Sequence, residues 1–126
     1  MYSHNMVGSN DLAKSKTFYD AIFKAVGGNE AIQDPNGRLV YMHNGGLFIV
    51  TKPINGEPAT YANGGTIGFA AANKDQVDAW HAAGLANGGT CEGAPGPRPG
   101  APGNAYGAYL RDPDGNKICA FCQLPG

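Results

Sequence analysis

The sequence predicts an α+β fold of two βαβββ modules, which form a curved mixed sheet around a shared cleft with the helices on the outside. Strand-like, helix-like and strand-like segments follow one another twice along the chain. A doubled glycine, Gly27–Gly28 or Gly88–Gly89, ends each helix-like segment, and each half has an Asp-Pro-x-Gly hairpin turn, Asp34–Gly37 or Asp112–Gly115. Such repetition indicates two like units that bury a common core.

The first module is expected over about residues 1–52. The alternation of Tyr2–Gly8 predicts a strand, and Asn10 is expected to cap a helix with Asp11 in its first turn. Apolar residues then recur at helical spacing from Leu12 to Val26. Short strands are expected to follow at Glu30–Gln33, Arg38–His43 and Leu47–Thr51.

A polar, turn-rich linker is expected over residues 53–65, and the second module over about 66–124. Thr66–Ala72 is expected to form a strand, and Asn73 to cap a helix that carries Val77, Trp80, Ala83 and Leu85 on its apolar face. The strands expected to complete this module are Thr90–Glu92, Ala105–Arg111 and Lys117–Cys122.

Composition limits the partners that the protein can have. With 126 residues the chain fits a single domain, and nine basic against ten acidic residues leave a formal charge of −1. This balance gives no attraction to phosphate backbones or anionic lipid, so no nucleic acid or membrane partner is expected. Three cysteines cannot all pair within the chain, which favours a reducing, cytoplasmic location.

Several segments together carry a family resemblance. In the first half they are His4–Leu12 and Ser15–Tyr19, and in the second half Gly65–Phe69, Val77–His81 and Arg111–Lys117. By these motifs the chain resembles the glyoxalase/bleomycin-resistance/extradiol dioxygenase superfamily, also called the vicinal oxygen chelate superfamily. The resemblance covers nearly the whole chain and implies paired βαβββ modules, commonly in a homodimer.

In the enzymes of this superfamily a divalent metal such as Zn, Ni, Mn or Fe is bound by His or Glu on the first and last strands of each half. At the matching positions this sequence has His4, Thr66 and Cys119, while Leu47–Thr51 contains no imidazole or carboxylate. His4 is therefore the one usual metal ligand retained. Because a stable site needs about three protein donors, we expect no metal cofactor.

The resemblance also places a ligand-binding cleft between the modules. We expect His4, Thr66 and Cys119 to line it, together with Tyr109 from the penultimate strand. The proline- and glycine-rich segment Gly93–Gly103 is expected to cross its mouth as a loop. Arg98, at the centre of this segment, is expected either to clamp an anionic group or to be a solvated surface residue.

The leading functional hypothesis is binding of a small organic metabolite or xenobiotic in the cleft without metal chemistry. The alternative is an enzyme, such as a glyoxalase I-type lyase or a dioxygenase, that holds a metal through His4, Cys119 and a substrate atom or uses Cys119 directly. A third hypothesis is a structural subunit whose cleft is filled by side chains. The sequence does not identify the ligand.

Overall fold

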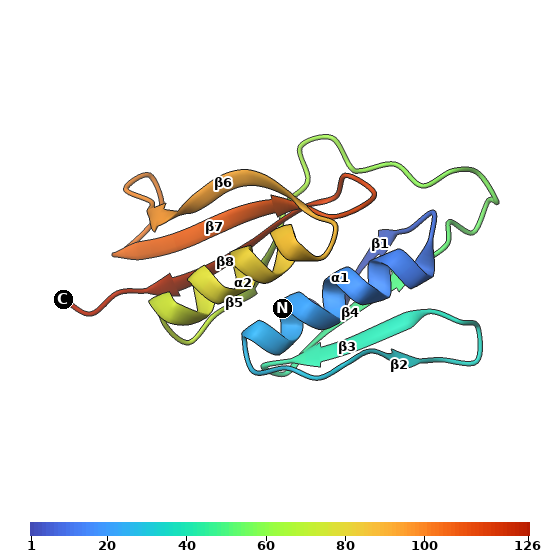
Figure 1. Ribbon diagram of the computed structural model, residues 1–126, viewed down its shortest axis with the longest axis horizontal. Helices are drawn as coiled ribbons and strands as arrows, with labels where there is room; N and C mark the ends of the chain where they lie inside the picture. The colour runs from blue at the N-terminus through green and yellow to red at the C-terminus, as the bar shows by residue number, and fades with distance from the viewer.

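The computed structural model describes residues 1–126 and has two helices and two four-stranded sheets (Figure 1). The first module comprises β1 (Asn5–Gly8), α1 (Leu12–Ala25), β2 (Ile32–Gln33), β3 (Leu39–His43) and β4 (Gly46–Thr51). The second comprises β5 (Ile67–Ala70), α2 (Lys74–Ala86), β6 (Thr90–Pro97), β7 (Ala105–Arg111) and β8 (Lys117–Gln123). The predicted α+β fold of two βαβββ modules is therefore confirmed.

The two sheets have equivalent topologies. Their strand orders are β1-β4-β3-β2 and β5-β8-β7-β6, and only the pairs β1–β4 and β5–β8 are parallel. The strands therefore form two separate mixed sheets, each belonging to one module. Figure 1 looks onto both helices, which lie side by side on the same side of the strands and contact each other. The opposite face of each sheet, called the open face below, carries no helix.

One core serves both modules. Alternate strand residues point toward the helices, and they join the helices in a single cluster of 18 buried side chains. Phe48 of β4 and Phe69 of β5 meet in this cluster with ring centres 5.1 Å apart. The helices approach closely at Gly84, where an added Cβ would lie 3.3 Å from the Phe18 ring. The modules are thus joined by aromatic packing as well as by the linker.

The start of α1 differs by one residue from the prediction. Asp11 is the N-cap, because its side chain accepts a hydrogen bond from the Lys14 amide at 3.1 Å. The Asn10 side chain instead accepts from the Ala59 amide at 2.7 Å and donates to the Ala59 carbonyl at 3.1 Å. Asn10 therefore fastens the linker to the first module. The predicted cap of α2, Asn73, is confirmed by its bond to the Gln76 amide.

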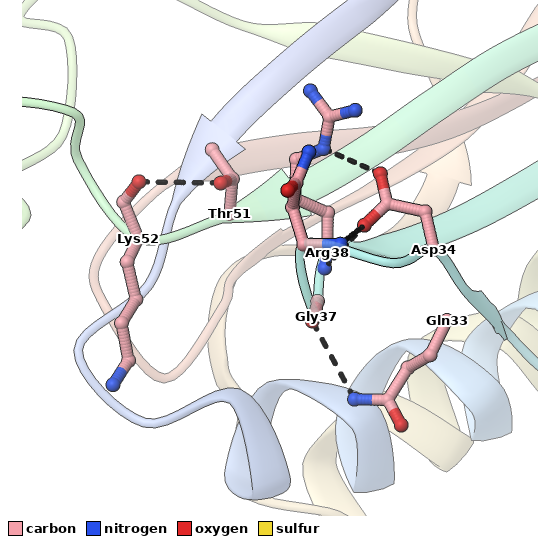
Figure 2. Close-up of polar contacts among 7 residues, drawn as sticks. Gln33, Asp34, Gly37, Arg38, Thr51 and Lys52 are labelled. Carbon is pink, nitrogen blue, oxygen red and sulfur yellow. Dashed lines mark hydrogen bonds and ion pairs between the residues drawn. The ribbon is translucent and has the colours of Figure 1, made fainter.

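Both predicted hairpin turns are present and end on a glycine with positive φ, +79° at Gly37 and +89° at Gly115. In the first turn Asp34 accepts from the Arg38 backbone amide at 3.0 Å and pairs with its guanidinium at 2.5 Å (Figure 2). Residues with a Cβ adopt this backbone region only with strain. The Asp-Pro-x-Gly spacing therefore fixed the position of each β-turn.

The second turn also connects the modules. The Asp112 carboxylate accepts from the Tyr19 hydroxyl at 2.6 Å, and Asn116 donates to the Gly8 carbonyl at 3.1 Å. Asp112 is buried, and burial raises its pKa while the hydrogen bonds from Tyr19 and Asn116 oppose that rise. The motif Arg111–Lys117 therefore has a structural role at the module boundary.

The prediction that all of Gly93–Gly103 is a loop is wrong. Residues 93–97 continue β6, with Gly93 opposite Tyr109 and Pro97 opposite Tyr106 on β7. Prolines are tolerated here because β6 is an edge strand, whose outer amides need no partner. Only the segment that follows Pro97 and precedes β7 forms a connecting loop.

Candidate functional site

A hollow lies where the two modules meet. Its walls come from β1, α1, β3 and β4 of the first module and β5 of the second, and its volume is about 200 Å³. The lining residues are Asn5, Phe23, Tyr41, His43, Asn44, Gly46, Leu47, Phe48, Ile67, Gly68, Phe69 and Ala70. We call this site the junction hollow. Its volume is smaller than the roughly 300–1,000 Å³ usual for sites that bind drug-sized ligands.

Aromatic rings form the floor of the junction hollow. Phe23 stacks on Tyr41 at 4.7 Å between ring centres, with an interplanar angle of 18°. Phe69 meets Phe23 edge-on at 5.0 Å, and the same ring packs against Phe48. All four side chains are buried. The strand period of two places Tyr41 and Phe48 opposite each other on the helix side of the first sheet.

Polar atoms stand at the rim. His43 Nε2 lies 2.8 Å from the Ala70 carbonyl oxygen, a contact that joins the end of β3 to the end of β5. Because a carbonyl only accepts, Nε2 carries the hydrogen, and Nδ1 is the acceptor of the neutral ring. The Asn5 side chain has no hydrogen-bond partner within the chain. The rim therefore offers an imidazole acceptor and a free amide.

No Asp, Glu, Lys or Arg side chain lines the junction hollow, and its polar side chains are those of Asn5, Tyr41, His43 and Asn44. The Tyr41 hydroxyl is occupied by its bond to the Asp20 carboxylate at 2.7 Å. Burial and that bond raise the pKa of Tyr41, so the phenol stays neutral. The site is thus an aromatic cavity that lacks Asp, Glu, Lys and Arg side chains and has a small polar rim.

The structure brings together three of the five residues expected in the cleft, Arg98, Tyr109 and Cys119, on the open face of the second sheet. Tyr109 and Cys119 are paired across β7 and β8, and Arg98 Cζ lies 5.6 Å from the centre of the Tyr109 ring. Thr66 precedes β5 and lines a separate hollow with Met6 and Val7 of β1. None of these residues lines the junction hollow.

His4 lies apart from this group. It precedes β1 in the first module, is exposed to solvent, and its Nδ1 contacts the Ser3 hydroxyl at 2.8 Å. It has no hydrogen bond to Thr66, Tyr109 or Cys119. The assignment of His4 and the other four residues to one ligand-binding cleft stays a prediction.

The residues present do not fit a divalent metal. No group of three or more His, Cys, Asp or Glu side chains lies close enough together to hold an ion. Cys119 is a poor donor as well, because burial raises the pKa of its thiol to about 11 and disfavours the thiolate that a metal would bind. Accordingly, no reaction step is assigned to a metal here.

The Arg98 side chain forms hydrogen bonds with the backbone at the end of β6. Its guanidinium donates to the carbonyls of Ala94 at 2.6 Å, Gly96 at 3.1 Å and Pro97 at 3.2 Å. These bonds use three of its donors on backbone groups, so part of its capacity to bind an anion is already occupied. A role as an anion clamp stays a prediction.

The sequence analysis missed Lys117 on the open face and most of the junction hollow. Lys117 Nζ lies 5.1 Å from the centre of the Tyr109 ring and forms no ion pair. In the hollow, Phe23, Tyr41 and Phe48 had the helix and strand spacing of ordinary core residues. His43 beside a hairpin turn was the one available signal, since a polar aromatic residue at a strand end often lines a site.

Comparisons with known proteins agree on one family. The sequence model described as "Glyoxalase/Bleomycin resistance protein/Dioxygenase superfamily" matches residues 2–120. The crystal structure of a glyoxalase/bleomycin resistance protein from Albidiferax ferrireducens T118 is 53% identical in sequence, with a TM-score of 0.89 over 99% of both chains. No curated protein matches the sequence.

More distant structures share the fold. A glyoxalase-related enzyme from Fulvimarina pelagi is 19% identical, with a TM-score of 0.73 over 96% of this chain and 87% of that one. A lactoylglutathione lyase from Agrobacterium tumefaciens is 23% identical, with a TM-score of 0.63 over 94% of this chain and 90% of that one. At these identities the likeness concerns architecture, and the chemistry depends on the residues at the site.

Proposed function

The chain belongs to the glyoxalase/bleomycin resistance protein/dioxygenase superfamily, and on this premise we propose that it binds a small organic metabolite or xenobiotic without a metal cofactor. The ligand occupies the junction hollow between the two modules. The observation that carries this proposal is the cavity itself, whose floor is four buried aromatic rings contributed by both modules. Concave aromatic sites with a few polar groups are the usual binding sites for small molecules.

Absence of a metal from the binding mechanism is supported by residue types as well as geometry. His4 belongs to no group of three potential metal ligands, Thr66 carries a neutral hydroxyl, and burial disfavours the thiolate of Cys119. These donors suit neither Zn²⁺ nor Fe²⁺. Binding therefore relies on burial of the ligand against the aromatic floor and on hydrogen bonds at the rim.

The test is a titration of ¹⁵N-labelled protein with a panel of small organic molecules, followed through backbone amide shifts. Binding in the junction hollow shifts the amides of Leu47, Phe69 and Ala70, and Ala70→Phe, which fills the rim, abolishes those shifts. Ala82→Phe on the exposed face of α2 is the matched control and leaves binding unchanged. If only the amides of Tyr109 and Cys119 shift, the ligand binds on the open face, and the proposal is overturned.

A second assay addresses catalysis. We expect no turnover of the methylglyoxal–glutathione hemithioacetal with added Ni²⁺, Zn²⁺, Mn²⁺ or Fe²⁺. Metal-dependent turnover that disappears in His4→Ala would support a lyase instead. Stoichiometric metal in the dialysed protein would likewise contradict binding without a metal.

We also propose that the protein is a cytoplasmic homodimer. The family resemblance supports the dimer, and the three free thiols of Cys91, Cys119 and Cys122 support a reducing compartment. Neither helix has the length and apolar composition needed to span a membrane. Light scattering at micromolar concentration measures the oligomeric state, and a monomer mass would contradict the dimer.

A further inference from the structure

The chemistry of the junction hollow indicates what class of ligand it accepts. Resting on the function proposed above, we infer that this ligand is a neutral molecule with a single aromatic ring that carries a hydrogen-bond donor. Three independent features of the cavity lead to this class: the arrangement of its rings, the absence of charge, and the hydrogen-bonding state of His43.

The ring requirement follows from the floor and from the size of the cavity. Phe23, Phe48 and Phe69 already contact one another edge-on or tilted at centre distances of 5.0–5.9 Å, which is the geometry that aromatic pairs prefer. A further flat ring continues this arrangement, whereas a saturated ring gains no such contact. An apolar cavity of about 150 Å³ accommodates benzene, so about 200 Å³ holds one substituted ring.

The charge requirement follows from the lining. No Lys, Arg, Asp or Glu side chain reaches the cavity. A carboxylate or ammonium group placed against the aromatic floor would lose its hydration and gain no ion pair in exchange. The cationic side chains of Arg98 and Lys117 lie instead beside Tyr109 on the open face of the second module. The junction hollow therefore selects a neutral ligand.

The donor requirement follows from the tautomer of His43. Since Nε2 donates to the Ala70 carbonyl, Nδ1 of the neutral ring is left as an acceptor at the rim. The Asn5 side-chain oxygen is a second free acceptor on the same rim. A hydroxyl or amide N–H on the ligand satisfies one of them, while a purely hydrocarbon ligand leaves both to water.

The experiment compares four probes of similar size, each in an amide-shift titration of the wild-type protein. Benzyl alcohol has an aromatic ring, no charge and a hydrogen-bond donor. Toluene lacks the donor, benzoate is charged, and cyclohexylmethanol has a saturated ring in place of the aromatic one. Benzyl alcohol is expected to bind about five- to tenfold more tightly than toluene, because one net hydrogen bond contributes about that factor. Benzoate and cyclohexylmethanol are expected to bind more weakly than benzyl alcohol.

Variants test which protein side chain accepts the hydrogen bond from the ligand. His43→Phe is expected to reduce the preference for benzyl alcohol over toluene to about twofold or less, since the acceptor is lost. Asn5→Leu tests the second acceptor, and His4→Phe, an exposed histidine outside the cavity, is the matched control that keeps the preference. Amide spectra of each variant show directly whether its fold is retained.

The outcomes separate this inference from the proposed function. If no probe shifts the amides of the junction hollow, the proposed function fails. If the probes bind there but toluene, benzoate or cyclohexylmethanol equals benzyl alcohol, the ligand class is wrong while binding stands. Retention of the full preference in both His43→Phe and Asn5→Leu would also overturn the inference.

Discussion

The hydroxyl of Tyr19 on α1 donates a 2.6 Å hydrogen bond to the carboxylate of Asp112, which follows β7 in the other module. Tyr19 is fully buried and Asp112 is 4% exposed, so the bond lies in the protein interior. A buried carboxylate is costly unless hydrogen-bond donors surround it. Here a helix of the first module supplies such a donor to a turn of the second module. The bond therefore stabilises the packing of the two modules against each other.

Removing this donor tests its importance. Tyr19→Phe is expected to lower the free energy of unfolding by about 1–3 kcal/mol, because the buried carboxylate loses a partner. Urea denaturation measures the loss. Tyr109→Phe removes a hydroxyl that has no hydrogen bond in the chain, and its effect is expected to stay within about 0.5 kcal/mol. Equal midpoints for the two variants would show that the Tyr19–Asp112 bond adds nothing.

Asp20 makes stability sensitive to acid. Burial pushes the pKa of Asp20 upward, but hydrogen bonds from Lys16, the Ala31 amide and Tyr41 outweigh it and leave the pKa below its ordinary value. The stabilisation is therefore complete above the unfolded-state pKa of about 3.9 and is lost as the pH falls through the lower folded-state value. In thermal melts from pH 7 to pH 2, Asp20→Asn should start less stable and lose less stability on acidification. A wild-type acid dependence retained in full would refute this role.

Thiol reactivity should distinguish the cysteines. Cys91 is exposed, whereas Cys119 is buried with its pKa raised to about 11. Burial both disfavours the Cys119 thiolate and shields its sulfur, so iodoacetamide should label Cys91 at least about tenfold faster at pH 8. Peptide mass spectrometry after timed quenching gives both rates, with Cys91→Ser as the control for peptide assignment. Comparable labelling of Cys119 would mean that its site opens readily to solvent.

The contact between the helices limits residue size at Gly84. A methyl group there would run into Leu110 and would lie 3.3 Å from Phe18 and 3.4 Å from Ile22. Alanine favours a helix by about 1 kcal/mol over glycine, but overpacking costs about 1–3 kcal/mol. We therefore expect Gly84→Ala to destabilise the protein in urea by up to about 2 kcal/mol. A more stable Gly84→Ala variant would show that the helices separate easily.

The sequence by itself determined the elements and their repetition. Helical spacing from Leu12 to Val26, the cap at Asn73 and the two Asp-Pro-x-Gly turns act over a few residues, so each could be identified without the rest of the chain. The position of β6 at the edge of its sheet depends on strand pairing and cannot be inferred from the neighbouring residues alone. For that reason the sequence predicts a loop from Gly93 onward, although residues 93–97 belong to β6 and Pro97 lies opposite Tyr106 of β7.

Only the tertiary structure decided where the junction hollow lies. Thr66, Tyr109 and Cys119 are predicted to line a cleft, and this stays a prediction. The junction hollow is lined by other residues, such as Phe23 and Phe69, which come from different modules and have the spacing of ordinary core residues. The residues of a strand show its alternation, but which of its faces meets a second module depends on contacts between residues far apart in the chain. Such contacts, like that of His43 with Ala70, form only when the whole chain packs, and they leave no periodic signal in the sequence.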